Sequence, residues 1–325
     1  MFLLVILFFT TLIALLSFAK PLEADDLKDR NPAIVLATHG TTDPVDLVDL
    51  LSLENRIKDA FPCYDIHMSF MNRKILQVWR DRAKDSNFKK YFPQVSERFY
   101  NIKNPIATLG LIQDLGPRLV LMQPLQLIDG PEYHDLVSIV ENLRKIKCFD
   151  RYDVPFPWIG LGGPALGLGD GQKENLFRVA NALAYLFNQA KELKAAVVLI
   201  ADLNGGVNPG VYNHLKLVLR NNYDCEIHVG LPESRQGIRE ILGKLEKKLP
   251  PPGPILMAPL TLVMGQELRE DLNGPQPDSW VNLIKASGYS VVTHMEGLGS
   301  NEIFSEIFVE TLKRLEEAVS RRYTD

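Results

Sequence analysis

The sequence has few cysteines and no excess of charge of one sign. Its three cysteines, Cys63, Cys148 and Cys225, allow at most one internal disulfide and lack the spacing of a metal-binding cluster. We interpret them as isolated thiols. Lys and Arg number 36 against 40 Asp and Glu, and the formal net charge is only −4. No strongly basic surface is therefore expected, and we predict no nucleic-acid partner.

Several motifs that mark common enzymes are also absent. The sequence contains no Ser nucleophile elbow, no H-E-x-x-H and no C-x-x-C, so hydrolase and thiol-redox functions have no motif to support them. The glycine-rich stretch at residues 160–164 lacks the Lys and the Ser or Thr of a phosphate-binding loop, and it lacks the spacing of a dinucleotide fingerprint. We expect a tight turn there and no nucleotide cofactor.

The N-terminal segment is almost entirely apolar from Phe2 to Leu16. This run suits the apolar region of a signal peptide and is short for a membrane span of about 20 residues. Ser17-Phe18-Ala19 supplies a small-x-small cleavage site before Lys20. We predict that residues 1–24 are a signal peptide, or a membrane anchor if they are not cleaved, and that the protein is periplasmic or extracellular.

An internal repeat organises the rest of the chain. Residues 121–132 and 256–267 share the pattern L-M-x-P-L-x-L-[I/V]-x-G-x-E, which matches Glu132 with Glu267. An earlier block at residues 34–41 matches 197–204 and places His39 opposite Asp202. A glycine-rich block at residues 160–163 is matched with 297–300. The preserved order of three blocks indicates two copies of one unit. The first copy is longer by about 26 to 28 residues, which we place in the polar run 81–104.

The chain of 325 residues exceeds what one core usually organises, which agrees with two domains. We predict similar α/β domains at residues 32–170 and 195–322, joined by a bridging helix at 171–194. Short, continuous apolar runs alternate with helical patterns, which is typical of parallel sheets covered on both faces. Strands are expected at residues 33–37, 64–70, 119–127, 158–161, 195–201, 226–230, 255–263 and 290–294. Helices are expected at residues 45–60, 73–82, 132–147, 170–193, 210–221, 236–248, 278–287 and 301–322.

Ligands of open parallel sheets bind beyond the carboxyl ends of the strands, so the polar residues just after each strand are the candidates for a site. In this sequence they are His39, Thr41, Thr42, Gln126, Asp129, Glu132, His134, Asp202, Asn204, Glu233, Gln266, Glu267 and Glu270. Matched positions of both copies carry acids or histidine, which favours a functional role over a solvated loop.

Four sequence features together carry a family resemblance. They are the T-H-G-T at the end of the first strand, P-L-x-L-[I/V]-x-G in each half, the D-S-W at residues 278–280 and the G-L-G at residues 297–299. With them the chain resembles the anaerobic cobalt chelatases of cobalamin biosynthesis, which belong with the class II tetrapyrrole chelatases. The resemblance extends from about Ala33 to Leu315. It implies two flavodoxin-like domains with an interdomain cleft, in which sirohydrochlorin receives cobalt or ferrous iron, as a substrate metal, without ATP.

The resemblance also implies a set of metal ligands. Family members hold the metal with two histidines and a glutamate, and these positions fall at Asp202, Glu233 and Glu267 of this sequence. Both imidazoles have become carboxylates. Asp202 and Glu267 are therefore the predicted catalytic residues, and all three acids are the predicted metal ligands. A carboxylate with a pKa near ~4 is a weaker base than an imidazole near ~6.5, unless burial or a neighbouring acid raises its pKa.

Two further predictions concern the first half. Short relatives of the family use a histidine at the position of His39, so a second choice of metal site is His39 with Glu132 and His134. For the substrate we predict contacts from Thr41, Arg73 and Lys74, because a tetrapyrrole carries carboxylates that basic side chains bind.

Alternative functions stay open at this point. One alternative is an exported protein that binds a tetrapyrrole, haem or a metal ion and catalyses no reaction. This role would explain why both histidines are absent. A two-lobed receptor for another solute is a third hypothesis. The sequence leaves open whether haem is bound and whether the chain forms a homo-oligomer.

Overall fold

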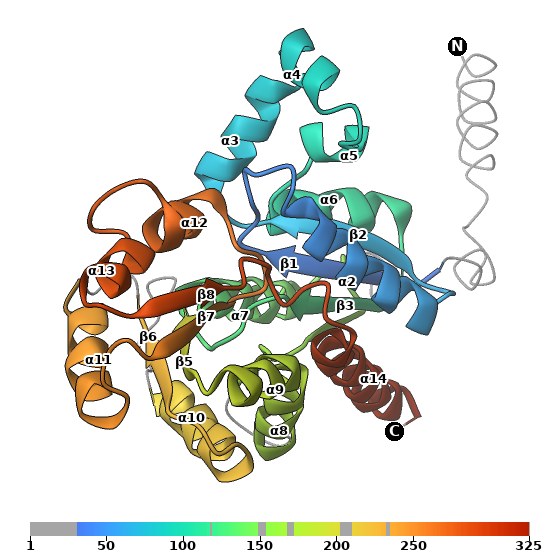
Figure 1. Ribbon diagram of the computed structural model, residues 1–325. Coiled ribbons are helices and arrows are strands. Elements are labelled where there is room, and N and C mark those ends of the chain that lie inside the picture. Colours follow the sequence, from blue (N-terminus) through green and yellow to red (C-terminus); the bar gives the residue numbers. More distant parts are fainter. Residues whose placement is uncertain are drawn as a thin grey trace, which may run out of the picture.

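Two parallel four-stranded sheets with the same strand order form the frame of the molecule (Figure 1). This computed structural model describes residues 31–117, 119–148, 154–167, 172–201, 210–231 and 235–324. The first sheet has the order β2-β1-β3-β4 and the second the order β6-β5-β7-β8. The strands are β1 Ala33–Thr38, β2 Asp65–Phe70, β3 Leu119–Pro124, β4 Trp158–Leu161, β5 Ala196–Ala201, β6 Ile227–Gly230, β7 Pro254–Leu260 and β8 Ser290–Thr293. The predicted α/β fold with two similar domains is confirmed.

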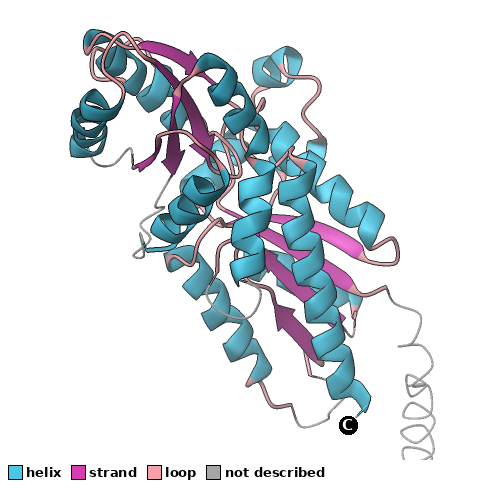
Figure 2. Ribbon diagram, turned by 60° about the horizontal axis from the view of Figure 1, so that its bottom comes forward, coloured by secondary structure: helices cyan, strands magenta, loops and turns pink. Residues whose placement is uncertain are grey.

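Helices cover both faces of each sheet (Figure 2). Helices of the first half are α2 Leu47–Ala60, α3 Arg73–Arg82, α4 Ser86–Tyr91, α5 Glu97–Tyr100, α6 Pro105–Leu115 and α7 Pro131–Arg144. Later in the chain follow α8 Gln172–Ala182, α9 Ala184–Leu193, α10 Gly210–Asn222, α11 Arg235–Lys248, α12 Gln266–Asn273, α13 Trp280–Ala286 and α14 Glu302–Thr324. The central strands β1 and β5 are buried along their whole length, which is why their sequences are apolar without alternation.

The register of the sheets tests the repeat. Ile34 pairs with Leu121 in the first sheet, and Val197 pairs with Leu256 in the second, so the first two matched blocks are equivalent in space. The third match is wrong. Gly160 lies within β4, whereas Gly297 lies in the loop after β8. The two glycines serve different contacts: a Cβ at Gly160 would meet Leu315 at 3.0 Å, and one at Gly297 would meet the Leu262 carbonyl oxygen at 2.3 Å.

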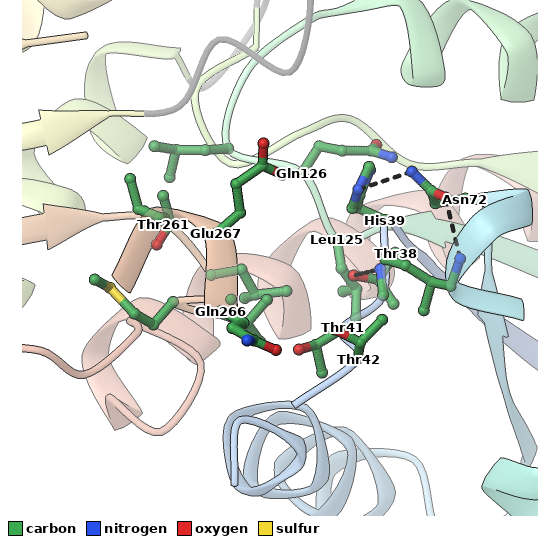
Figure 3. Close-up of a pocket in the computed structure, with 18 of the residues that line it drawn as sticks. Thr38, His39, Thr41, Thr42, Asn72, Leu125, Gln126, Thr261, Gln266 and Glu267 are labelled. Carbon is green, nitrogen blue, oxygen red and sulfur yellow. Dashed lines mark hydrogen bonds between the residues drawn. The ribbon is translucent and has the colours of Figure 1, made fainter. Parts of the chain in front are cut away.

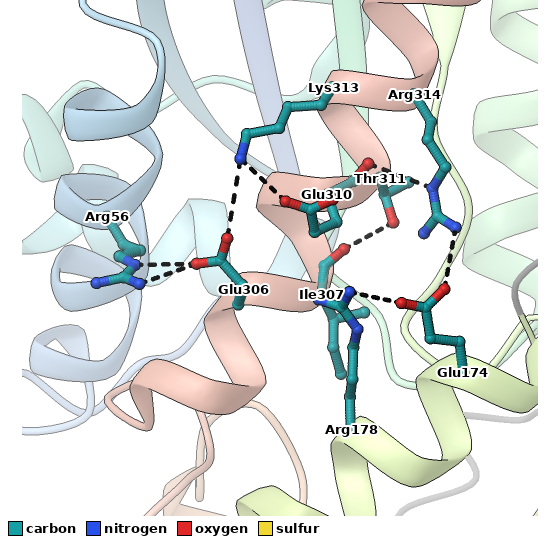
Figure 4. Close-up of polar contacts among 9 residues, drawn as sticks. All are labelled: Arg56, Glu174, Arg178, Glu306, Ile307, Glu310, Thr311, Lys313 and Arg314. Carbon is teal, nitrogen blue, oxygen red and sulfur yellow. Dashed lines mark hydrogen bonds and ion pairs between the residues drawn. The ribbon is translucent and has the colours of Figure 1, made fainter.

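The last helix returns to the first half. Although α14 belongs by sequence to the predicted second domain, it packs against α2, α8, β3 and β4. Phe304, Ile307, Phe308 and Leu312 on its inner face are buried in the core that contains β1. Ion pairs flank this contact (Figure 4), with Arg56 of α2 2.9 Å from Glu306. Exposed pairs of this kind contribute little, so apolar burial holds α14 in place.

The helices differ from the predictions at several points. The bridging segment forms two helices, α8 and α9, which are separated at Leu183. The polar run at residues 81–104, where we place the extra residues, contains α4 and α5. Its aromatic side chains pack edge-on: Phe88 against Trp79, and Tyr100 against Phe88. The helices α4, α5, α6 and α12 were not predicted, because they are short or lack a clear polar and apolar face.

The described residues include no helix that is both long and apolar enough to cross a membrane. The predicted signal peptide or anchor at residues 1–24 lies outside the described part of the chain, and so does Asp170 of the predicted bridging segment. The three cysteines form no disulfide.

Candidate functional site

A cavity of about 490 Å³ lies between the two halves (Figure 3). The first half lines it with residues 38–42, 72, 74, 75 and 125–127, and the second half with residues 260–268 and 271. These segments follow β1, β2, β3 and β7, so the cavity opens at the carboxyl ends of the strands, where ligands of such sheets bind. Its volume is within the range of roughly 300–1,000 Å³ that is usual for ligand pockets.

His39, Asn72 and Glu132 form a hydrogen-bonded group on the first-half side. His39 follows β1, Asn72 follows β2, and Glu132 lies in the first turn of α7 after β3, so the three strand ends bring them together. His39 Nδ1 lies 2.7 Å from Glu132 Oε1, and Asn72 Nδ2 lies 3.1 Å from His39 Nε2.

The hydrogen bonds of Asn72 define the tautomer of His39. Asn72 Oδ1 accepts from the backbone N–H groups of Lys74 and Ile75 and caps the N-terminus of α3. The Nδ2 group of Asn72 is therefore the donor to His39 Nε2, and the neutral His39 carries its proton on Nδ1 and donates it to Glu132.

The second-choice metal site is assembled only in part. His39 and Glu132 meet, but the His134 side chain is 67% exposed and its Nε2 lies 2.9 Å from Asp129 Oδ1, without hydrogen-bond alignment. His134 is two residues beyond Glu132 on α7, so the helix turns it away from His39. Within the described ranges no group of three or more His, Cys, Asp or Glu side chains is arranged to hold a metal.

Glu267 lines the cavity from the second half (Figure 3). It is the second residue of α12, two positions after the N-cap Gly265, whose φ of 70° requires glycine. Glu132 occupies the same place in α7 after Gly130, so the predicted match of the two glutamates is confirmed. The other predicted ligands, Asp202 and Glu233, lie outside the described residues.

The predicted substrate contacts are found in different surroundings. Lys74 and Thr41 line the cavity, and Arg73 does not. The Thr41 hydroxyl accepts a hydrogen bond from the Asp43 backbone at 3.0 Å and is buried, so this side chain stabilises the turn after β1.

Asp46 and Asp49 are functional candidates that the sequence did not reveal. Asp46 is the N-cap residue of α2 and Asp49 lies in its first turn, and both side chains extend to the second half. Asp46 accepts hydrogen bonds from the Gly265 backbone at 2.8 Å and from Arg269 at 2.7 Å. Asp49 accepts from the backbone and hydroxyl of Ser300, at 3.2 and 2.6 Å. They share a helix face with Leu50 and other core residues, which is the signal that could have identified them.

Burial dominates the electrostatics of both aspartates. It raises the pKa of the Asp46 carboxyl above its usual value, and Arg269 offsets this only in part. Burial likewise raises the pKa of Asp49, against the opposing effect of the Ser300 hydrogen bonds. The N-terminus of α12, and with it Glu267, is thus held by a buried carboxylate of the other half.

Comparison with known proteins gives consistent results. A family model described as cobalt chelatase (CbiK) matches residues 32–317. The chain is 26% identical over 282 residues to sirohydrochlorin cobaltochelatase CbiKC of Nitratidesulfovibrio vulgaris, an alignment that covers 86% of this chain and 88% of that protein.

Two solved structures are similar in fold. The first is the multi-domain protein DR2241 of Deinococcus radiodurans, which has structural similarity to chelatases; the TM-score is 0.53 at 11% identity. The match covers 87% of this chain and 55% of that one, so the chain spans about half of its length. The second is CbiX, the terminal enzyme for biosynthesis of siroheme in denitrifying bacteria, with a TM-score of 0.45, 13% identity and coverage of 87% and 98%.

Proposed function

The chain belongs to the cobalt chelatase (CbiK) family, and from this premise we propose that it inserts a divalent metal into a tetrapyrrole of the sirohydrochlorin type. The observation that carries the proposal is the cavity of about 490 Å³ between the halves, lined by strand ends of both sheets and by Glu267. A flat macrocycle that lies there contacts both halves. The reaction needs no nucleotide, because the exchange of metal for protons supplies the driving force.

The proposed metal ligands are Asp202, Glu233 and Glu267. The duplication supports this assignment: His39 and Glu132, the first-half residues matched to Asp202 and Glu267, lie 2.7 Å apart. The same positions of the second copy are expected to converge in the same way. A set of three carboxylates binds divalent ions through oxygen. Compared with a site that contains imidazoles, it has a weaker preference for metals that favour nitrogen ligands. We propose Co²⁺ as the metal, with ferrous iron as the alternative.

The proton acceptor follows from the hydrogen bonds at the cavity. Two pyrrole N–H protons must leave the ring when the metal enters. Both ring nitrogens of His39 are already hydrogen-bonded, to Glu132 and to Asn72. Glu267, on the opposite side of the cavity, is therefore the proposed acceptor of one proton, and Asp202, the other predicted catalytic residue, is the proposed acceptor of the second. Proton transfer to a positioned side chain contributes typically 10² to 10⁴-fold to a rate.

We propose that the protein is exported, because the run from Phe2 to Leu16 followed by a small-x-small site is typical of a signal peptide. N-terminal sequencing of the protein from the periplasmic fraction tests this. A mature protein that begins near Lys20 supports export, and an intact Met1 in the soluble cell extract contradicts it.

The insertion reaction is tested with purified protein, metal-free sirohydrochlorin and Co²⁺ under anaerobic conditions, followed by the absorbance of the ring. We expect a rate above the spontaneous one and a loss of about 10²-fold in Glu267→Gln. Glu270→Gln is the matched control, because Glu270 lies on the same helix and does not line the cavity. A wild-type rate equal to the spontaneous rate would exclude the enzymatic function.

A binding protein without chemistry is the second candidate. One observation favours it: this chain carries the carboxylates Asp202 and Glu267 at the two positions where the resemblance places metal-binding histidines. The double variant Asp202→His/Glu267→His separates the two functions. Insertion by the wild type supports the chelatase, and insertion by the double variant alone supports the binding protein.

A further inference from the structure

Gln126 and Thr261 occupy the same place in the two halves. Each is the third residue of the repeated P-L-x-L, just beyond the end of β3 or β7. The Gln126 carbonyl accepts from Ala165 N at 2.9 Å, and the Thr261 carbonyl accepts from Leu298 N at 2.9 Å. The carbonyl oxygen of the following residue, Leu127 or Leu262, also accepts a backbone hydrogen bond. The backbone therefore holds Gln126 and Thr261 at equivalent positions.

Both side chains are buried at the wall of the cavity with an unused polar atom. Gln126 and Thr261 are each 9% exposed and both line the cavity, where Figure 3 draws them on either side of Glu267. Gln126 Oε1 and Thr261 Oγ1 have no hydrogen-bond partner among the described residues. Buried polar atoms almost always have a partner, because an unsatisfied one is destabilising. An unsatisfied polar atom at each of two matched positions of one cavity indicates that the missing hydrogen-bond partner is a ligand.

The environment of Gln126 indicates which group the ligand provides. Its Nε2 lies 3.2 Å from the Met71 sulfur, a weak acceptor, so the amide oxygen is the atom that is left over. This oxygen needs a donor. The side chains of sirohydrochlorin are carboxylates at neutral pH and can only accept, so the donors on the metal-free ring are its pyrrole N–H groups. The Thr261 hydroxyl can donate to a carboxylate.

We propose that Gln126 and Thr261 are a matched pair of ligand-binding residues. Gln126 accepts a hydrogen bond from a pyrrole N–H of the metal-free ring, and Thr261 donates to a peripheral carboxylate. This inference rests on the proposed function. Because the N–H protons leave when the metal enters, Gln126 favours the metal-free ring over the metallated product, while Thr261 binds both alike.

The test uses the isosteric variants Gln126→Met and Thr261→Val of the full chain. Affinity for sirohydrochlorin and for its cobalt complex is measured by quenching of tryptophan fluorescence. A neutral hydrogen bond corresponds to a loss of about 3- to 10-fold in affinity. We expect that loss in Gln126→Met for the metal-free ring only, and in Thr261→Val for both forms. Unchanged affinities, or an equal loss for both forms in Gln126→Met, would overturn the proposal.

Stability of the ligand-free protein distinguishes a binding role from a structural one. Both variants remove an unsatisfied oxygen, so their urea midpoints are expected to equal or exceed that of the wild type. Gln123→Met is the control. Gln123 Oε1 also has no partner among the described residues, but its Nε2 donates to the Pro124 and Gly163 carbonyls and the side chain lies outside the cavity. Because this variant loses two hydrogen bonds, it is expected to lose stability and keep its affinity. A loss of stability in Gln126→Met like that of Gln123→Met would show a structural role.

The outcomes separate this inference from the proposed function. A wild type that binds neither form of the ring refutes the function and the pair together. A wild type that binds the ring with unchanged affinity in both variants refutes the pair alone.

Discussion

The Asp46 carboxylate of the first half lies 2.7 Å from the Arg269 guanidinium of the second half. Asp46 is the N-cap residue of α2, yet its side chain does not cap that helix. It accepts from the N-cap Gly265 of α12 instead. The helix that carries Glu267 is therefore anchored to the opposite half, and the geometry of the cavity depends on this contact.

Removal of the Arg269 charge is predicted to destabilise the protein. In Arg269→Met the Asp46 carboxylate, 4% exposed, loses its counter-ion. Breaking a buried pair costs about 3–5 kcal/mol, and we expect about 1–3 kcal/mol here because Arg269 is itself 35% exposed. Urea unfolding of Arg269→Met, Asp46→Asn and the double variant measures the coupling. Strictly additive effects would contradict a direct interaction.

Asp49 is predicted to make stability depend on pH. Burial raises its native pKa above the unfolded value of about 3.9, so the native state holds the proton more tightly. The stabilisation is full below the unfolded pKa and is lost as pH rises through the native pKa. Asn cannot ionise, so Asp49→Asn should gain stability relative to wild type between pH 3.5 and 7.

The measurement is a series of urea unfolding curves for wild type and Asp49→Asn across this pH range. A change in the free energy of unfolding that does not depend on pH cancels when the difference between variant and wild type is compared from one pH to the next. Asp59→Asn, on the exposed side of the same helix, is the control. A difference between wild type and Asp49→Asn that does not change with pH, or that shrinks as pH rises, would refute the assignment.

The sequence predicted the sheets well because their strands are buried on both faces. Short apolar runs such as β1 and β5, followed by polar turns, indicate buried strands. The two matched blocks predict that both sheets pair in the same register, as they do. Short polar helices were less predictable. The segment of α12 is mostly polar, and its position depends on Gly265 and on contacts from Asp46 that are distant in sequence.

The candidate site could be predicted only where the order of the strands in the sheet determines which side chains lie together. His39 and Glu132 follow neighbouring strands, and they do meet. His134 was grouped with them by proximity in sequence, but two residues along a helix turn a side chain to another face. The helix face that Asp46 and Asp49 share with core residues marks them as buried, but their partners Arg269 and Ser300 belong to the other half and could not be named from the first half alone.

Gly297 is predicted to tolerate no side chain. A Cβ there would lie 2.3 Å from the Leu262 carbonyl oxygen and 2.6 Å from Asp49 Oδ2, so Gly297→Ala should cost about 1–3 kcal/mol through overpacking. Gly110→Ala is the matched substitution. Gly110 lies within α6 with nothing within 4 Å of an added Cβ, and this variant should gain about 0.5–1 kcal/mol. Equal effects in thermal unfolding would contradict the tight contact at Gly297.

The last prediction concerns the proton on His39. In Asn72→Asp the side chain still caps α3 through one oxygen, but the group that faces His39 Nε2 changes from a donor to an acceptor. His39 then lies between two carboxylates, because Nδ1 already contacts Glu132. We expect its imidazole to bind a second proton at higher pH than in the wild type, as measured by NMR titration of the histidine ring protons.

Asn104→Asp is the control for this variant. Asn104 caps α6 by accepting from Ala107 N at 2.8 Å, so the same exchange at another N-cap tests the effect of the cap alone. The His39 titration should shift in Asn72→Asp and stay unchanged in Asn104→Asp. If both variants leave it unchanged, the Asn72 side chain does not lie within hydrogen-bonding distance of His39 Nε2 in solution, which would contradict the contact.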